Sequence, residues 1–224
     1  MVSVTAPTQP LTRPDPAPAP PRTPVAALLT AGACAGGVWV VQATAVGTAL
    51  GRRVDQAVMT TAGDAPAVVT RLADTLLDQV SAASVAVVLA ALSLVALLRG
   101  ALRAELAAAA VLLGANVTTQ VLKAVLGRPD SAGGSLPSGH VTLTATLVVA
   151  ALLVVAARWR TTVGLLGGAA VALVAVAVVV AQWHRPSDVV AALLVVGGWT
   201  AVACLALRPD RGHRILVAAA PGGP

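Results

Sequence analysis

The sequence contains little charge, few cysteines and almost no aromatic side chains. Charged residues make up 11% of the 224 residues, and neither Phe nor Tyr occurs. The two cysteines, Cys34 and Cys204, lie within apolar segments and have no metal-ligand spacing. This pattern excludes a disulfide framework and a cysteine metal centre. We therefore expect both thiols to be small, buried hydrophobic side chains.

A surplus of basic residues gives the chain a net charge of +6 and a pI near 11.2. A nucleic-acid-binding surface would gather that charge into a run or stripe with aromatic side chains between the basic ones. Here the 15 Lys and Arg are scattered between apolar segments. We therefore expect no nucleic-acid partner and interpret the surplus as a signal for orientation in a membrane.

The sequence is rich in long apolar segments. Hydrophobic residues make up 57% of the chain and the mean hydropathy is +0.86, more than a soluble domain needs for one core. Six apolar segments are each near the ~20 residues that cross a bilayer as a helix. The sequence therefore predicts an all-α integral membrane six-helix bundle, with spans near 25–50, 82–98, 106–126, 141–157, 163–183 and 189–207.

The two ends of the chain differ from this domain. Eight of the 15 prolines fall within residues 1–24, a composition that cannot bury a core, so we expect a disordered cytoplasmic tail there. The same stretch lacks the basic start of a secretory signal peptide, and we expect none. One membrane domain is predicted at 25–207 and a second cytoplasmic tail at 208–224.

The stretch 51–80, after the first predicted span, is more polar than the spans. Apolar residues recur there at every fourth position, and charged residues lie on another face. This pattern predicts one amphipathic helix lying in the membrane interface. Its apolar stripe consists of Val68, Leu72, Leu76 and Val80, and its charged face of Arg71, Asp74 and Asp78.

Alternation of six spans brings the loop after the third span and the loop after the fifth to the same side of the membrane. Nine of the 15 Lys and Arg then lie on the side of the two termini, and six lie on the side of these loops. The positive-inside rule places both termini in the cytoplasm and both loops on the extracytoplasmic face of the cell membrane. Two of the three histidines, His140 and His184, are in or beside these loops.

Polar residues in the third predicted span form the first part of a candidate site. Asn116, Gln120 and Lys123 follow the spacing i, i+4, i+7 and share one helix face. Polar groups at membrane depth are costly and normally face a bundle interior. The alternative is helix–helix hydrogen bonding, with a lysine that extends to the lipid headgroups.

The sequence Pro137-Ser138-Gly139-His140 forms the second part, where a loop enters the fourth predicted helix. A helix start offers free main-chain N–H groups and the positive end of the helix dipole, both suited to a phosphate. Gly139 allows the main chain to approach a ligand closely. The alternative is a helix cap by Ser138 beside an interfacial histidine.

His184 and Asp188 form the third part, one helical turn apart at the start of the sixth span. An aspartate near an imidazole fixes its tautomer and stabilises the imidazolium, which leaves the other nitrogen free to act as base or nucleophile. The alternative is an aspartate that only caps a helix. Topology brings these two residues to the same side as Lys123, Arg128 and His140, and this combination favours a phosphate-handling site.

At these residues the chain resembles the type 2 phosphatidic acid phosphatase superfamily of membrane lipid phosphatases. The pattern of that family is K-x6-RP, then PSGH, then SR-x5-H-x3-D. Here PSGH is intact at 137–140 and H-x3-D is intact at 184–188. The order of the motifs, their placement at span ends and the six-span architecture also agree with the family, over roughly residues 82–207.

The resemblance implies metal-independent hydrolysis of a phosphoester, without a cofactor. His184 would be the nucleophile that forms a phosphohistidine, and Asp188 would orient it. His140 would protonate the leaving oxygen and later activate water. The substrate, a lipid phosphate or polyprenyl diphosphate, would be held through its phosphoryl oxygens by Lys123, Arg128 and the main chain at Ser138 and Gly139.

The sequence departs from the family pattern at two places. Lys123 and Arg128 are separated by four residues rather than six, so that Asp130 occupies the strict arginine position. Ala177 and Val178 stand where the third motif has Ser-Arg. The phosphate pocket is therefore one or two cations poorer than in the family.

Two other functions remain open from the sequence. The first is a non-catalytic membrane protein that keeps the fold to bind or move an anionic lipid. The second is a metal site built from His140, His184 and Asp188, since two histidines and a carboxylate can hold a metal. The nearby Lys123 and Arg128 would repel a cation, which disfavours the metal site.

Overall fold

A computed structural model of the chain describes residues 24–80, 82–126 and 136–207, and all regular structure in these ranges is helical. The predicted tails at 1–24 and 208–224, apart from Pro24, and the predicted ligand Arg128 lie outside the described residues. The all-α prediction is confirmed for the described part. Its elements are α1 (Pro24–Val41), a π-helical turn (Gln42–Val46), α2 (Ala49–Gly63), α3 (Ala67–Asp78), α4 (Ala82–Leu98), α5 (Leu102–Leu126), α6 (Gly139–Val154), a 3-10 turn (Ala157–Trp159), α7 (Arg160–Val180) and α8 (Pro186–Ala206).

Four helical stretches are long and apolar enough to cross a membrane, which makes the chain a multi-pass membrane protein. They are Pro24–Val46, Leu102–Leu126, Ala157–Val180 and Pro186–Ala206. Two further apolar helices, Ser84–Leu98 and Gly139–Val154, are shorter, and at ~1.5 Å per residue neither reaches the ~30 Å thickness of a hydrocarbon core. The number of six spans therefore stays a prediction.

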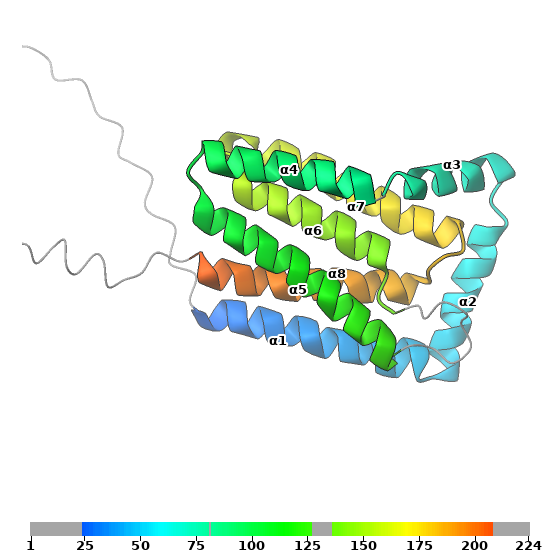
Figure 1. The fold of residues 1–224 in the computed structure, drawn as a ribbon. Helices are drawn as coiled ribbons and strands as arrows, with labels where there is room; N and C mark the ends of the chain where they lie inside the picture. Colours follow the sequence, from blue (N-terminus) through cyan, green and yellow to red (C-terminus); the bar gives the residue numbers. More distant parts are fainter. Residues whose placement is uncertain (1–23, 81, 127–135, 208–224) are drawn as a thin grey trace, which may run out of the picture.

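The apolar helices α1 and α4–α8 lie side by side along one direction, and α2 crosses them at one end (Figure 1). The described chain enters at α1 and leaves at α8 on the opposite end of the molecule from α2. The central helices are α6, which contacts α4, α5, α7 and α8, and α8, which contacts α1, α5 and α6. The helices that begin with the two histidine motifs are therefore also the most enclosed ones.

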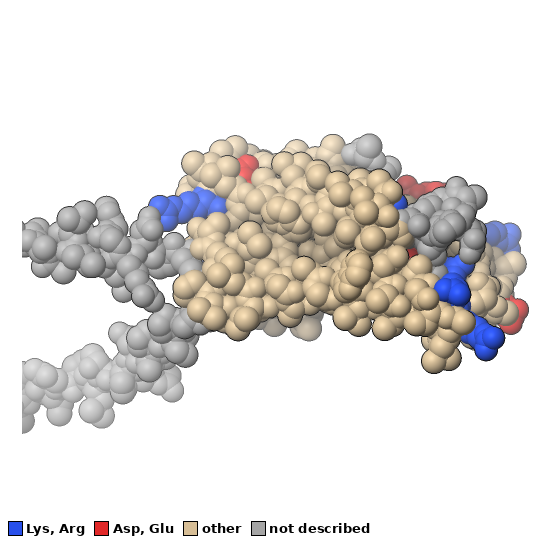
Figure 2. Space-filling view, turned by 90° about the horizontal axis from the view of Figure 1, so that it is seen from below, with Lys and Arg blue, Asp and Glu red and all other residues tan. Residues whose placement is uncertain are grey.

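The surface of the molecule fits a lipid environment. In Figure 2 charged side chains gather towards the two ends, and the face between them is almost free of them. Large apolar side chains such as Leu97, Leu113 and Leu165 are exposed along the helices, an arrangement that lipid tolerates and water does not. The thiol of Cys204, which we expected to be buried, is exposed on this surface, and Cys34 is half-buried.

The single amphipathic helix predicted at 51–80 is wrong in its extent. The segment forms two helices, because α2 ends at Gly63 and α3 begins at Ala67 after Pro66. Proline restricts the residue before it to extended conformations and lacks the N–H that a helix interior needs, so it divides the segment. The first apolar segment also ends earlier than predicted, since α2 begins at Ala49.

The buried side of α3 only partly coincides with its predicted apolar stripe, of which Leu76 packs against α7. Ala73 and Leu77 pack with Val174, Ala177 and Val178 of α7 in one apolar cluster. Val68 and Leu72 of the predicted stripe are exposed instead. The helix thus has an apolar side that α7 covers and further apolar residues, Val68 and Leu72, that are exposed.

Candidate functional site

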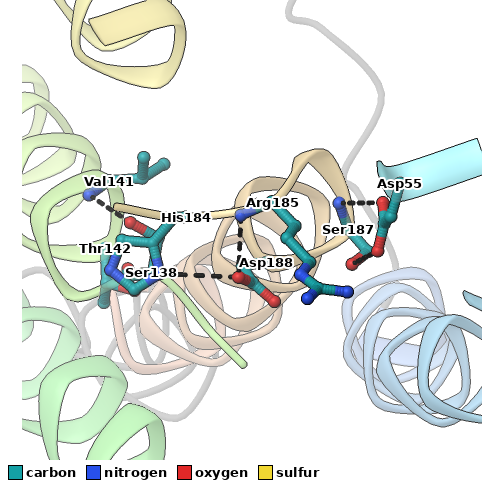
Figure 3. Close-up of polar contacts among 8 residues, drawn as sticks. All are labelled: Asp55, Ser138, Val141, Thr142, His184, Arg185, Ser187 and Asp188. Atoms are coloured by element: carbon teal, nitrogen blue, oxygen red, sulfur yellow. Dashed lines mark hydrogen bonds and ion pairs between the residues drawn. The ribbon is translucent and has the colours of Figure 1, made fainter. Parts of the chain in front are cut away.

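Asp188 and His184 face one another at the start of α8, as Figure 3 shows. Oδ2 of Asp188 lies 3.5 Å from Nδ1 of His184, and the same oxygen accepts the main-chain N–H of Arg185 at 2.9 Å. The Asp188 side chain is fully buried, and the His184 side chain is 11% exposed. The carboxylate therefore caps the helix and faces the imidazole at once.

The turn between α7 and α8 sets the position of His184. Gln182 adopts a left-handed conformation, with φ of 61°. The N–H groups of Trp183 and His184 both donate to the main-chain oxygen of Val178, at 2.9 and 3.0 Å. These bonds reverse the chain at the end of α7, and Pro186 then starts α8 at a position that suits proline.

Ser138 joins the second motif to the third. Its main-chain N–H donates to the main-chain oxygen of Asp188 at 3.0 Å, and its side chain is fully buried. Ser138 is also the N-cap of α6, with its hydroxyl 3.5 Å from the N–H of Val141. Because the N–H of Ser138 is used in this bond, the main-chain donors left at the α6 start are those of Gly139 and His140, for which the described residues provide no acceptor.

His140 lies beside the third motif. Its ring contacts the Trp183 ring edge to face, with centroids 5.3 Å apart and planes 64° apart. His184 and Lys123 both lie close enough to the His140 imidazole to interact with it electrostatically. The two histidines and the lysine, which come from α6, the α7–α8 turn and α5, therefore form one electrostatic group.

Lys123 projects from α5 towards the start of α6. A Cβ added to Gly139 would lie 3.5 Å from Nζ of Lys123, and Lys123 interacts electrostatically with Asp188. Because Gly139 has no side chain, nothing at that position separates the Lys123 ammonium group from the free N–H groups at the start of α6. This arrangement puts a fixed cation next to a helix N-terminus, a combination suited to an anion.

The polar face predicted for α5 is partly wrong. Gln120 is exposed, whereas Thr119, which the pattern did not select, is fully buried. The helix face towards α6 therefore contains Asn116, Thr119 and Lys123, spaced i, i+3, i+7. The error arose because residues i+3 and i+4 both lie near a given face, and a lone threonine is a weak polar signal.

A ladder of hydrogen bonds connects α5 to α6 below the site. The hydroxyls of Thr119 and Thr142 lie 3.1 Å apart, and that of Thr142 donates to the main-chain oxygen of Ser138 at 2.8 Å. One turn further on, Nδ2 of Asn116 lies 3.4 Å from the hydroxyl of Thr146. This ladder fixes the start of α6 against the helix that provides Lys123. The one sequence pattern that could have indicated this ladder is the spacing of four residues from Ser138 to Thr142 and from Thr142 to Thr146.

Asp55 of α2 is a second buried carboxylate that the sequence did not indicate. It is 5% exposed, and it accepts from the N–H of Ser187 at 3.2 Å and from the Ser187 hydroxyl at 2.5 Å. These two residues are far apart in sequence, and no sequence pattern distinguishes Asp55 from exposed acids such as Asp64 and Asp78. Only the path of the chain brings α2 to the start of α8.

The positions of the absent Ser-Arg pair are filled by packing. Ala177 is 4% exposed and Val178 is fully buried, in the cluster that includes Leu77 of α3 and Val141 of α6. An apolar side chain and a neighbouring helix thus occupy the place where the family pattern has an arginine. Among the described residues, no group of three or more His, Cys, Asp or Glu is arranged to hold a metal ion.

Comparison with known families agrees with the motifs. Residues 129–213 match the model of the PAP2 superfamily, and this range contains both PSGH at 137–140 and H-x3-D at 184–188. The match confirms the predicted resemblance to the type 2 phosphatidic acid phosphatases and supports a membrane protein of the phosphatase type. No curated protein and no solved structure gives a significant match to the chain.

Proposed function

We propose that the protein is a membrane phosphatase that hydrolyses a lipid phosphate or a polyprenyl diphosphate through a phosphohistidine at His184, without a metal ion. The observation that supports this proposal is that residues of α5, α6 and α8 lie close together at the start of α6 and α8. Asp188 faces His184 at 3.5 Å, Ser138 donates to the main chain of Asp188, and Lys123 lies beside Gly139. The family match over residues 129–213 supports phosphatase chemistry at that point.

The first chemical step is transfer of the phosphoryl group to His184. With Nδ1 directed to Asp188, Nε2 of His184 attacks phosphorus and the bond to the ester oxygen breaks. The leaving oxygen takes a proton from His140. The negative charge on the equatorial oxygens is stabilised by Lys123, by Arg128 and by the N–H groups at the start of α6.

The second step regenerates the enzyme. His140, now neutral, removes a proton from a water molecule, whose oxygen attacks the phosphohistidine. The P–N bond breaks, inorganic phosphate is released, and the electron pair returns to Nε2 of His184. Asp188 stabilises the imidazolium in both transition states, because its carboxylate is held in place by the N–H of Arg185.

The surroundings of the site favour a substrate with an apolar chain. A pocket of about 290 Å³ lies between α1, α5 and α8, and its lining is almost wholly apolar. Its lining residue Leu122 is the chain neighbour of Lys123. The pocket does not contain the histidines, so it is not the reaction centre, but it offers an apolar surface below the headgroup site. Its lining also includes Val38, Leu194, Val195 and Trp199.

One specific observation favours the second candidate, a non-catalytic lipid-binding protein. Val178 is fully buried where the family pattern has an arginine, so the site has one cation fewer for the transition state. Such a protein would bind the phosphate headgroup and leave it intact.

The test is phosphate release by the purified protein in detergent, across a panel of lipid phosphates and diphosphates, with His184→Ala as the matched control. We expect release by the wild type only, and we expect it to persist after exhaustive EDTA treatment. No release from any lipid that nevertheless binds would establish the second candidate. If EDTA abolishes phosphate release and one divalent metal restores it, the metal-independent mechanism is wrong.

A further inference from the structure

The helix α2 has only two buried residues, Asp55 and Met59, and they are one turn apart on the same face. Asp55 contacts Ser187 in the first turn of α8, and Met59 contacts Gln182 in the turn between α7 and α8, so the two contacts flank His184. The rest of α2 is more exposed. The helix lies across the end of the bundle where the α7–α8 turn is found (Figure 1). The two buried residues of α2 therefore both contact the chain on either side of His184, the proposed nucleophile.

The contact at Asp55 holds the first turn of α8. Ser187 is the second residue of α8, and its N–H is one of the donors that a helix leaves without an internal partner. Asp55 accepts this N–H at 3.2 Å and the Ser187 hydroxyl at 2.5 Å. A carboxylate at this place also meets the positive end of the helix dipole. Figure 3 shows this pair beside Asp188, the next residue in the chain.

The contact at Met59 holds the other end of the turn. Nε2 of Gln182 donates to the main-chain oxygen of Met59 at 2.8 Å. Gln182 is the one described non-glycine residue with a positive φ, a conformation that costs energy for a residue with a side chain and needs support from its surroundings. His184 therefore lies between two points, Gln182 and Ser187, that are both fixed to α2.

We propose that α2 is a clamp on the histidine turn and that Asp55 is a positioning residue for His184 and Asp188. This inference rests on the proposed phosphatase function. Asp55 acts through Ser187: by fixing the first turn of α8, it keeps the carboxylate of the adjacent Asp188 directed at Nδ1 of His184. Residue 55 lies outside the segment that matches the family, 129–213, so neither the motifs nor the match assigns it a role.

The expected effect is on the rate of reaction and not on substrate binding. A displacement of about 1 Å at a reacting group can cost about 100-fold in rate. The phosphate ligands in the proposed site come from α5, the start of α6 and Arg128, and Asp55 is not one of them. Loss of the clamp should therefore lower kcat and leave KM nearly unchanged.

The experiment compares three variants with one control in the full-length protein in detergent. We expect Asp55→Ala to lower kcat at least ~10-fold with KM within ~2-fold of the wild type. Asp55→Asn should retain most of the turnover, because its amide oxygen accepts the N–H of Ser187 and its amide nitrogen donates to the hydroxyl. The control is Asp64→Ala, which removes an exposed carboxylate next to α2 and should leave both constants unchanged.

Coupling identifies the path of the effect. Asp55→Ala combined with Ser187→Ala should cost no more than Asp55→Ala alone, since both changes break the same contact. Amide hydrogen exchange of the peptide covering 181–188 gives a readout that needs no activity. We expect exchange to be at least ~10-fold faster in Asp55→Ala than in Asp64→Ala, because local opening exposes the N–H groups of Arg185 and Ser187.

The outcomes separate this inference from the proposed function. A wild type that releases no phosphate overturns the phosphatase, and hydrogen exchange then tests the clamp alone. An active wild type whose Asp55→Ala variant matches Asp64→Ala in kcat overturns the positioning role. If Asp55→Asn loses as much turnover as Asp55→Ala, the charge of Asp55 acts directly and the positioning role is also wrong. Unchanged exchange at 181–188 would disprove the clamp.

Discussion

In the first turn of α8, Oδ2 of Asp188 lies 3.5 Å from Nδ1 of His184, and the N–H of Arg185 donates to that same oxygen at 2.9 Å. The bond to Arg185 ties the carboxylate to the main chain that follows His184. The imidazole and its partner thus belong to one short rigid segment. This relationship lets the two roles of Asp188, as helix cap and as partner of the imidazole, be separated by mutation.

Asp188→Asn should remove the charge and keep the cap. The amide oxygen of asparagine still accepts the N–H of Arg185, so we expect the melting temperature to change little. The imidazolium loses its counter-charge, and we expect turnover to fall at least ~100-fold, the scale of one lost electrostatic contact in an active site. Asp188→Ala should lose the same activity and a further ~1 kcal/mol of stability through the missing cap. A fully active Asp188→Asn would restrict Asp188 to capping.

His184→Ala and His140→Ala should each lower turnover at least ~100-fold, as expected for the loss of a nucleophile or a general acid. The two variants differ in the covalent intermediate. With radiolabelled substrate and rapid quenching in alkali, which preserves phosphohistidine, label should remain on the wild type and be absent from His184→Ala. Near-normal turnover in either variant would remove that histidine from the mechanism.

Sequence reasoning located the motifs correctly and missed the contacts that hold them. Membrane insertion requires long apolar helices, and these can be recognised in the sequence. PSGH and H-x3-D are local patterns at helix starts, so they can be recognised in the same way. Asp55 and Thr119 are not, since their roles depend on which helix lies opposite. Asp55 meets Ser187 because α2 crosses the end of the bundle where α8 begins.

The same limit applies to α3 and to position 178. Periodicity selected Val68 and Leu72, although the side of α3 that α7 covers carries Ala73 and Leu77. A helix with two apolar sides gives no signal that tells which side meets protein and which meets lipid. Likewise, the sequence showed that Val178 replaces an arginine, but only the packing shows that the space is filled.

The orientation in the membrane can be tested with two single cysteines in a variant in which Cys34 and Cys204 are replaced by alanine. Asp64→Cys lies between α2 and α3 at the end of the bundle with the histidines, and Arg158→Cys lies in the 3-10 turn before α7 at the opposite end (Figure 1). Both positions are exposed. We expect an impermeant thiol reagent to label Asp64→Cys on intact cells and Arg158→Cys only after permeabilisation. The reverse pattern would invert the proposed orientation.

Arg128 is the subject of the last prediction, because the site lacks the arginine that the family pattern has at position 178. A phosphate monoester carries nearly two negative charges, and the transition state spreads them over the equatorial oxygens. Lys123 lies beside Gly139, at the proposed phosphate position. Arg128 would then stabilise a large share of the phosphate charge that Lys123 does not neutralise. We expect Arg128→Ala to lower the rate over ~100-fold, or ~3 kcal/mol in transition-state stabilisation. Arg128→Lys should recover little, since a point charge does not reproduce the two-pronged contact of a guanidinium.

The control for this prediction is an arginine introduced where the family has one. Val178 is fully buried in an apolar cluster with Leu77 and Val141, so a guanidinium there would have to displace packed side chains and would be buried without a partner. We therefore expect Val178→Arg to lower the melting temperature strongly and to rescue none of the activity lost in Arg128→Ala. Phosphate release by the wild type, Arg128→Ala and the double variant on one substrate checks this. If Val178→Arg instead folds normally and releases phosphate where the wild type releases none, the natural protein is a lipid-binding relative that lost its chemistry at position 178.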